Sequence, residues 1–237
     1  MSPVAAPAAT LQAEHGFTLV EMLVAMVTGM VVILATLSVL DISISQSSRI
    51  TERTDADQRG RLAMEKILLE LHSSCIADPF TPVQPESTET NLRFISQTGA
   101  NASFTTVTMH EIKLNTATGK LTDASYVSSP VEGTTMTFPS TPTRTETILT
   151  GVSSSKLEGK TVPVFSYYKY AGGNLSSTEE TTPLIKTDAE ATAEVTVAFT
   201  VAPSSERTTA DRTVDFTNTA VLRYDPASAG GSNTPCA

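Results

Sequence analysis

The chain has 237 residues, with 25 acidic side chains against 16 Lys and Arg and a formal net charge of −9. This balance argues against a nucleic-acid partner, because no excess of cations is available to replace phosphate counterions. Charged residues make up only 17% of the chain, too few for a coiled-coil rod or a charged disordered tail. The 38 Thr and 25 Ser residues favour a β-rich exported domain, since Thr is common in half-buried strands.

The most informative segment is an uncharged apolar run of 19 residues from Met22 to Leu40. A bilayer core about 30 Å thick needs roughly 20 apolar residues in a helix, and extension back to Phe17 meets that length with Glu21 inside. A cleaved secretory signal has a basic segment before a shorter apolar core and a small-residue site after it. This sequence has no Lys or Arg before Arg49 and no A-x-A site after the run. The run therefore predicts a membrane anchor.

Proline placement predicts one long helix that extends well beyond the apolar run. No proline occurs between Pro7 and Pro79, and proline is excluded from helix interiors. The second half of this stretch carries an apolar stripe at helical spacing: Met64, Ile67, Leu68, Leu71 and Cys75. A continuous helix from residue 17 to residue 74 would rise about 87 Å. No single small domain buries a helix of that length, so its first half must face lipid or other subunits.

Beyond residue 79 the pattern changes to short strands separated by turn residues. A proline-containing linker is expected at 79–90, and the expected strands are 91–97, 104–114, 121–127, 147–151, 162–170, 193–201 and 213–224. Gly119 supplies a positive φ in the turn 115–120, which predicts a β-hairpin between the flanking strands. The last two strands are expected to pair, and residues 128–145 and 171–188 have the composition of loops.

Glu21 needs an explanation, because a carboxylate inside an apolar helix is expensive unless it is paired or functional. It ends the segment His15-Gly16-Phe17-Thr18-Leu19-Val20-Glu21, directly before the apolar run. This segment and the run resemble the prepilin-type cleavage and methylation motif of type IV pilins and type II secretion pseudopilins. The resemblance implies cleavage after Gly16 by a membrane-embedded aspartyl peptidase. It also implies N-methylation of Phe17 and retention of Glu21 for assembly. Without that context, Glu21 could equally lie at the membrane edge and reach water.

Cleavage would create a free α-amine on Phe17 beside the apolar helix. Its positive charge can pair with the carboxylate of Glu21, most usefully that of a neighbouring subunit, which offsets two desolvation costs. The leader of this family usually carries Lys or Arg, whereas residues 1–16 carry neither. The positive-inside rule therefore gives little support for an orientation. A single-pass membrane protein with an extracytoplasmic C-terminal domain is expected from the motif.

The expected fold class is α+β, with a long N-terminal helix and an antiparallel β-sheet domain packed on its second half. The expected parts are a leader at 1–16, a transmembrane and assembly helix at 17–40, an extracytoplasmic amphipathic half at 41–78 and a β-rich head at 79–237. The hairpin HEIKLNTATGKLT, the stretch VPVFSYY and the final strand pair resemble minor pilins and J-type pseudopilins, actinobacterial ones in particular. The resemblance implies as partners other pilins or pseudopilins, the prepilin peptidase and N-methyltransferase, an inner-membrane assembly platform and membrane lipid.

The sequence carries no pattern for catalysis, a cofactor or a metal ion. His15 leaves with the leader, and His72 and His110 lie in different expected elements. There is no C-x-x-C pair, no nucleophile elbow and no phosphate-binding glycine loop. The acids Asp188, Glu190 and Glu194 match no calcium-loop spacing, so a solvated face is favoured there. The chain is therefore expected not to be an enzyme.

Two functions remain open from the sequence. The favoured one is a minor-pilin-like or pseudopilin subunit of a type IV pilus or type II secretion-like filament, displayed at the cell surface after assembly. The alternative is a monomeric, membrane-anchored extracytoplasmic binding or adhesion domain in which the motif is incidental. The two differ in one observable property, because a filament subunit loses its first 16 residues and appears in sheared surface material.

The two cysteines predict one disulfide bond, because oxidising compartments allow disulfides to persist. Cys75 ends the expected long helix and Cys236 is the penultimate residue of a Gly- and Ser-rich tail. A bond between them would close nearly the whole β domain into one loop and tie the tail to the helix. The alternative is two unrelated thiols.

Overall fold

The computed structural model describes residues 16–75, 80–97, 107–129, 137–171, 174–204 and 212–222. It combines a long helix with antiparallel sheets, which confirms the predicted α+β class. The chain divides into two compact units between Ser48 and Arg49. The first unit contains the start of the long helix, and the second contains the remainder of that helix and the sheets.

Helix α1 runs from Leu19 to His72 and has 54 residues, which confirms the long helix expected from the absence of proline. In the first unit every residue from Gly16 to Ser47 is exposed. The second unit contains all the buried positions of α1, namely Ala56, Gly60, Ala63, Met64, Ile67 and Leu71. The expected apolar stripe is confirmed, since Met64, Ile67, Leu71 and Cys75 are buried and Leu68 packs against the core.

The first sheet has four antiparallel strands in the order β1-β2-β3-β4. They are β1 (Asn91–Ser96), β2 (Thr108–Asn115), β3 (Lys120–Val127) and β4 (Arg144–Thr150). The β2–β3 hairpin is the one that the sequence predicts, with Asn115 opposite Lys120. Its turn depends on Gly119, which has φ +62°, and on the Asn115 side chain, which accepts bonds of 3.1 Å from two following backbone N–H groups.

The second sheet has five strands. The order is β11-β10-β8-β9, and β5 pairs with β10 as well. The strands are β5 (Val152–Ser153), β8 (Phe165–Ala171), β9 (Asn174–Leu175), β10 (Thr192–Val201) and β11 (Val214–Val221). The predicted pairing of the last two long strands is confirmed, and it places Phe199 opposite Phe216. A separate two-stranded hairpin joins β6 (Lys156–Leu157) to β7 (Lys160–Thr161).

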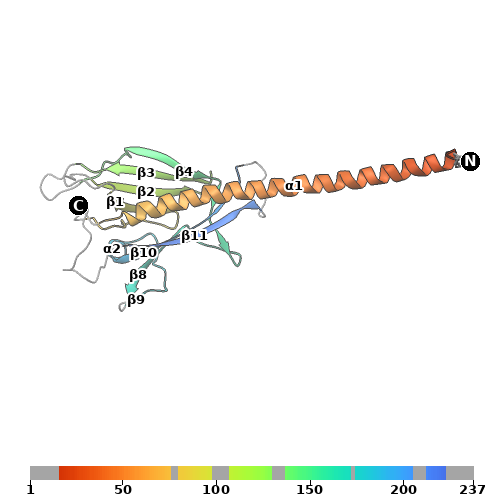
Figure 1. Ribbon diagram of the computed structural model, residues 1–237. Helices are drawn as coiled ribbons and strands as arrows, with labels where there is room; N and C mark the ends of the chain where they lie inside the picture. The colour runs from red at the N-terminus through yellow and green to blue at the C-terminus, as the bar shows by residue number, and fades with distance from the viewer. Residues whose placement is uncertain are drawn as a thin grey trace, which may run out of the picture. The chain divides into compact units, whose positions relative to one another are not determined.

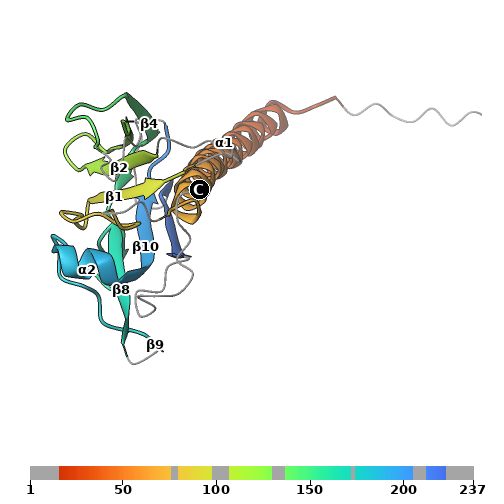
Figure 2. The same ribbon diagram turned by 90° about the vertical axis from the view of Figure 1, so that its left-hand side faces the viewer.

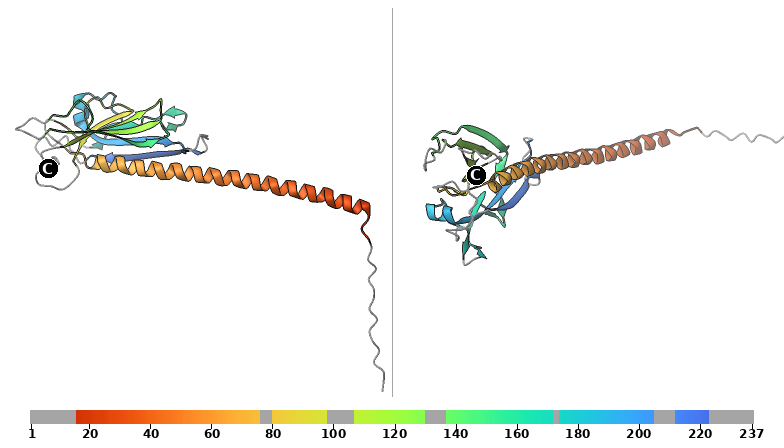
Figure 3. Two further views of the ribbon diagram at one scale, coloured as in Figure 1. Left: turned by 90° about the horizontal axis from the view of Figure 1, so that it is seen from above. Right: turned by 60° about the vertical axis from the view of Figure 1, so that its left-hand side comes forward.

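One core joins the second half of α1 to both sheets. Figure 1 shows the four-stranded sheet above this part of the helix and the five-stranded sheet below it, whereas Figure 2 and the left panel of Figure 3 show both sheets on one side of it. Fully buried side chains come from α1, from the first sheet and from the second sheet: Ile67, Phe94, Leu121, Phe165, Tyr167 and Phe199. The helix and the second sheet lie close together at Gly60, where an added Cβ would lie 2.1 Å from the ring of Phe216. Any larger residue there would force this ring to move.

The segment expected to be a linker at 79–90 is instead part of the folded domain, as far as residues 80–90 are described. Val83 and Ser87 are fully buried. The backbone N–H of Gln84 donates to the carbonyl of Arg93 at 2.8 Å, and that of Ile95 donates to Pro82 at 2.8 Å. The prolines thus occupy an irregular segment alongside β1, where their missing N–H groups are not needed for a regular ladder.

The region expected to be a loop at 171–188 contains β9 and the start of a short helix, α2 (Lys186–Ala191). Six residues are too few to show a helical apolar period, so the sequence pattern could not identify α2. The same reason applies to β5, β6, β7 and β9, which have two residues each.

Candidate functional site at the start of the long helix

The predicted cleavage point lies immediately before α1 and is open to solvent. Gly16 and Phe17 precede the helix, and the Phe17 side chain is 76% exposed. A Cβ added at Gly16 would meet no atom within 4 Å. Nothing in the described part of the chain therefore requires glycine at this position. The open space lets another molecule approach the backbone closely at this point.

Thr18 caps the N-terminus of α1. Its carbonyl accepts a bond of 3.2 Å from the N–H of Met22, and its hydroxyl accepts one of 3.3 Å from the N–H of Glu21. Thr-x-x-Glu is the capping-box pattern, in which the cap side chain satisfies one of the unpaired N–H groups of the first turn. The sequence prediction missed this role of Thr18, although the spacing of Thr18 and Glu21 is its signal.

Glu21 lies in the first turn of α1. An acidic side chain is favourable there because the N-terminus of a helix carries a partial positive charge. No hydrogen bond or ion pair of its carboxylate is present among the residues that the structure describes. The carboxylate is thus available for a partner outside the described part of the chain.

The apolar run that follows is the helical segment that is long and apolar enough to cross a membrane, and none of it is buried within the chain. Each of its three polar side chains donates a hydrogen bond from its hydroxyl group to a backbone carbonyl of the same helix. Thr28 donates to the Val24 carbonyl at 2.9 Å, Thr36 to Ile33 at 2.8 Å and Ser38 to Leu34 at 2.9 Å. A polar group without a partner in lipid costs several kcal/mol. These internal bonds make the run compatible with a bilayer.

Gly16, Phe17 and Glu21 lie together at the start of α1, whereas Cys75 lies beyond its other end. Cys75 is 7% exposed, and its N–H donates to the Ile95 carbonyl at 3.3 Å. Its backbone is therefore held against β1. Cys236 lies outside the described residues, so the Cys75–Cys236 disulfide stays a prediction.

His110 is buried between two carboxylates, those of Asp123 and Glu70. Its Nδ1 lies 3.1 Å from both carboxylate oxygens of Asp123, its Nε2 lies 3.6 Å from Glu70, and its ring stacks on Phe94. No hydroxyl or thiol within the described ranges is hydrogen-bonded to this imidazole. The cluster connects α1 to β2 and β3.

The described residues contain no group of three His, Cys, Asp or Glu side chains that could hold a metal ion. Two of the acids considered for calcium instead face lysines. Asp188 lies 3.6 Å from the ammonium group of Lys169, and Glu190 lies 3.7 Å from that of Lys186.

The N-terminal segment matches a known protein family. The model of the prokaryotic N-terminal methylation motif matches residues 11–37, which include Gly16, Phe17, Glu21 and most of the apolar run. No curated protein and no solved structure matches the chain.

Proposed function

We propose that this chain is a minor-pilin-like or pseudopilin subunit of a filament. The proposal starts from its type IV pilin-like N-terminal motif. The subunit is held in the membrane by the first half of α1 and assembles through that helix after its leader is removed. The match over residues 11–37 carries this proposal. The role is structural, and its partners are other pilins or pseudopilins, the processing enzyme and the assembly platform.

The proposed processing step is hydrolysis of the peptide bond between Gly16 and Phe17, followed by methylation of the new Phe17 amine. Two features support this site. Gly16 has open space where a side chain would be, so an enzyme can approach its backbone closely. Phe17 is exposed and lies before the first helical residue, Leu19. The peptide bond is therefore not part of the helical hydrogen-bond ladder, which a peptidase would otherwise have to open.

The proposed partner of Glu21 is the Phe17 amine of a neighbouring subunit. Glu21 is one turn into α1, and its carboxylate has no partner in the described part of its own chain. In a membrane an unpaired carboxylate is expensive, and an ammonium group supplies the missing charge. Each newly added subunit would then place its helix in one register along the filament.

The C-terminal unit is proposed to lie outside the cytoplasm. Its many Thr and Ser residues suit an exported domain, and the resemblance to the prepilin motif supports a cleavage point at the cytoplasmic face of the membrane, before the apolar run. The size of the chain favours a minor, tip or initiating subunit over a major pilin.

The decisive experiment is mass spectrometry of the mature N-terminus in sheared surface material. We expect a peptide that begins with N-methylated Phe17, and we expect Gly16→Asp to leave full-length protein in the membrane. Assembled wild-type protein that keeps Met1 or Ser2 at its terminus would exclude the proposal. It would favour a monomeric membrane-anchored binding domain.

A second experiment compares the loss of the Glu21 carboxylate with the loss of a control carboxylate, that of Glu65, on the same helix. Loss of one partner of a buried ion pair costs roughly 3–5 kcal/mol, so Glu21→Ala should reduce incorporation into filaments by about a hundredfold or more. Glu65 is exposed on the second half of α1, and Glu65→Ala should assemble at the wild-type level. Equal incorporation of both variants would mean that Glu21 lies at the membrane surface without a partner.

A further inference from the structure

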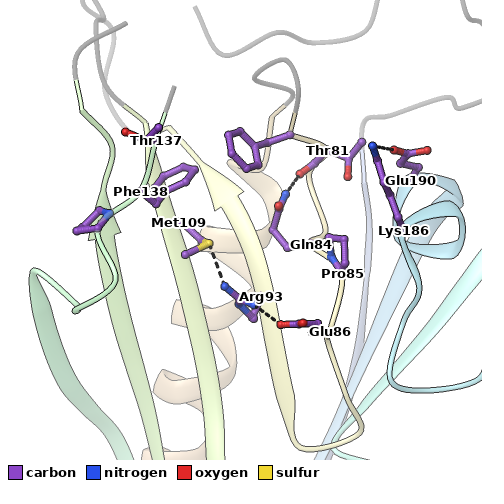
Figure 4. A pocket seen from close by; sticks show the side chains of 12 residues that line it. Thr81, Gln84, Pro85, Glu86, Arg93, Met109, Thr137, Phe138, Lys186 and Glu190 are labelled. Carbon is purple, nitrogen blue, oxygen red and sulfur yellow. Dashed lines mark hydrogen bonds and ion pairs between the residues drawn. The ribbon is translucent and has the colours of Figure 1, made fainter. Parts of the chain in front are cut away.

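A cavity of about 650 Å³ opens on the second unit, and all the residues that line it belong to that unit. It lies on the face of β1 and β2 that is turned away from α1. Successive strand residues point to opposite faces, and Phe94 and His110 contact the helix side of this sheet. Arg93 and Met109, their neighbours in sequence, line the cavity on the other face (Figure 4).

One wall of the cavity is aromatic and apolar. Phe80 and Phe138 meet edge to face, with ring centroids 5.2 Å apart and planes at 74°. They pack on a small second core of Ile95, Val107 and Met109. Aromatic faces carry partial negative charge and attract the positive edges of C–H groups. This wall therefore suits a ligand with a flat, weakly polar C–H surface.

The floor and the opposite wall carry charges that balance. Arg93 lies 3.2 Å from Glu86, and Lys186 lies 3.7 Å from Glu190. Figure 4 shows these two pairs at the bottom and on the right of the cavity. Two cations and two anions give a local charge of zero, so neither an anion nor a cation is favoured by its charge. The pairs also present N–H donors beside carboxylate acceptors, which suits a neutral ligand whose groups both donate and accept.

Arg93 has donors that no strong acceptor satisfies. One guanidinium nitrogen faces the sulfur of Met109 at 3.8 Å, and a thioether is a weak acceptor. Its Nε is buried, and no hydrogen-bond partner of that atom is present in the described residues. A guanidinium group offers five N–H donors, and among the described residues Glu86 is the one strong side-chain acceptor for them. The buried Nε is out of reach of a bound molecule, but the Arg93 side chain is 28% exposed, and its exposed N–H groups can donate to an acceptor oxygen in the cavity.

The wall formed by residues 80–86 is held in place before any ligand binds. Glu86 has φ +66°, which is uncommon for a residue with a side chain. Its N–H donates to the Leu184 carbonyl at 2.9 Å, and the Leu184 N–H donates to Ser87 at 2.9 Å. Gln84 bonds the carbonyl of Thr81 across the same turn. Fixed walls reduce the entropy that binding must overcome.

We propose that this cavity binds a neutral saccharide. The volume is that of a small-molecule site, and the aromatic wall accepts the C–H face of a sugar ring while the charge pairs bond its hydroxyl groups. A purely apolar ligand would cover the charged pairs without replacing their contacts with water, which is costly. This inference does not depend on filament assembly.

The test measures binding of sugars to the full-length chain in detergent micelles by ligand-observed NMR and calorimetry. The neutral probes are glucose, galactose, N-acetylglucosamine, lactose and maltose. Glucosamine serves as the cationic probe and glucuronic acid as the anionic probe. We expect saturable binding of at least one neutral sugar, and weaker binding of both charged probes. A proline-rich peptide is included because aromatic grooves also bind such segments. The proposal is overturned if no neutral sugar binds to folded protein, if a charged sugar binds more tightly, or if only the peptide binds.

Variants then place the sugar in this cavity. Arg93→Met should weaken binding about tenfold or more, because it removes hydrogen bonds from a charged donor. Lys186→Met should also weaken it, and since the Lys186 side chain is 75% exposed, this second variant keeps the test valid if Arg93→Met does not fold. Arg144 is an exposed arginine on β4 of the same sheet and does not line the cavity. Arg144→Met should bind like the wild type, and an equal loss in this control would refute the assignment.

Discussion

The two halves of α1 share one backbone but differ in what covers their apolar side chains. In the first unit the apolar residues are exposed, for example Ile33 at 59% and Leu34 at 62%. In the second unit Ile67 and Leu71 are fully buried by the sheets. The comparison teaches that the more hydrophobic half of the helix is the one that the described residues leave uncovered. We expect its cover to come from lipid or from other subunits.

The difference between the two halves is tested most directly by an isoleucine-to-alanine substitution in each half of α1. Ile67→Ala should lower the stability of the second unit by about 2–5 kcal/mol, because it leaves a cavity in a packed core. Ile33→Ala should leave that stability unchanged, because Ile33 is exposed among the described residues and belongs to the other unit. Chemical unfolding of the full chain in detergent, followed by near-ultraviolet circular dichroism, measures both. A comparable loss from Ile33→Ala would refute the division between the halves.

The predicted Cys75–Cys236 disulfide should contribute the next largest effect, and only in the second unit. Loops of about 100 residues are stabilised by roughly 4.7 kcal/mol in the chain-entropy model, and typical measured values are about 2–4 kcal/mol. Reduction should lower the melting temperature of the second unit and leave the helicity of the apolar run unchanged. Peptide mapping without reductant should first show the cross-link. Two freely alkylated thiols in protein from the cell surface would exclude it.

The two glycines of α1 provide a third comparison. Gly60→Ala should cost about 1–3 kcal/mol, because the new methyl group overlaps the ring of Phe216 and forces it to move. Gly29 has no atom within 4 Å of an added Cβ, so Gly29→Ala should not change the melting temperature of the second unit. It should raise the helicity of its own segment slightly, since Ala is the better helix former. An unchanged melting temperature for Gly60→Ala would show that Phe216 does not pack there.

The smallest expected effect is that the second unit loses some stability at acidic pH. Lys66, hydrogen-bonded to Glu146, lowers the pKa of that carboxyl below its ordinary value of 4.5. Burial acts to raise the pKa of Asp55, but hydrogen bonds from Ser204 and Arg59 bring it below 3.8. Because both values are depressed in the folded state, their contribution is present at neutral pH and is lost as the pH falls through them.

The effect can be measured by recording the midpoint of urea unfolding at a series of pH values from neutral to about 3. The wild type should be slightly more stable than Glu146→Gln at neutral pH, and the difference should disappear at the acidic end. The difference should be small, because the pair is partly exposed. A difference that grows in acid would contradict the assigned direction of the shift.

Much of the fold was accessible from the sequence, because its signals are periodic or local. The apolar stripe from Met64 to Leu71 has the helical period, and it lies on the buried face of the helix, whereas Cys75 is buried beyond the end of the helix at His72. The β2–β3 hairpin has a turn that requires Gly119. Cleavage, methylation and pairing at Gly16, Phe17 and Glu21 stay predictions, since they involve molecules that this chain does not contain.

What the sequence could not predict depends on contacts between distant residues. Val83 and Ser87 lie in a proline-containing segment that is typical of a linker, yet β1 buries them. The saccharide cavity has the same origin. Its lining comes from four segments of the chain, which contribute Phe80, Arg93, Phe138 and Lys186. No local sequence pattern predicts that these residues lie together. The need for glycine at Gly60 likewise depends on Phe216, more than a hundred residues later.

The hydroxyl groups of Thr28, Thr36 and Ser38 have a consequence for any movement of the first half of α1. Each hydroxyl donates to a carbonyl of its own helix, so its acceptor travels with it. A helix built in this way can pass from hydrocarbon to a protein environment without exchanging one hydrogen-bond partner for another. These three hydroxyl groups therefore add no barrier to leaving the bilayer and none to returning.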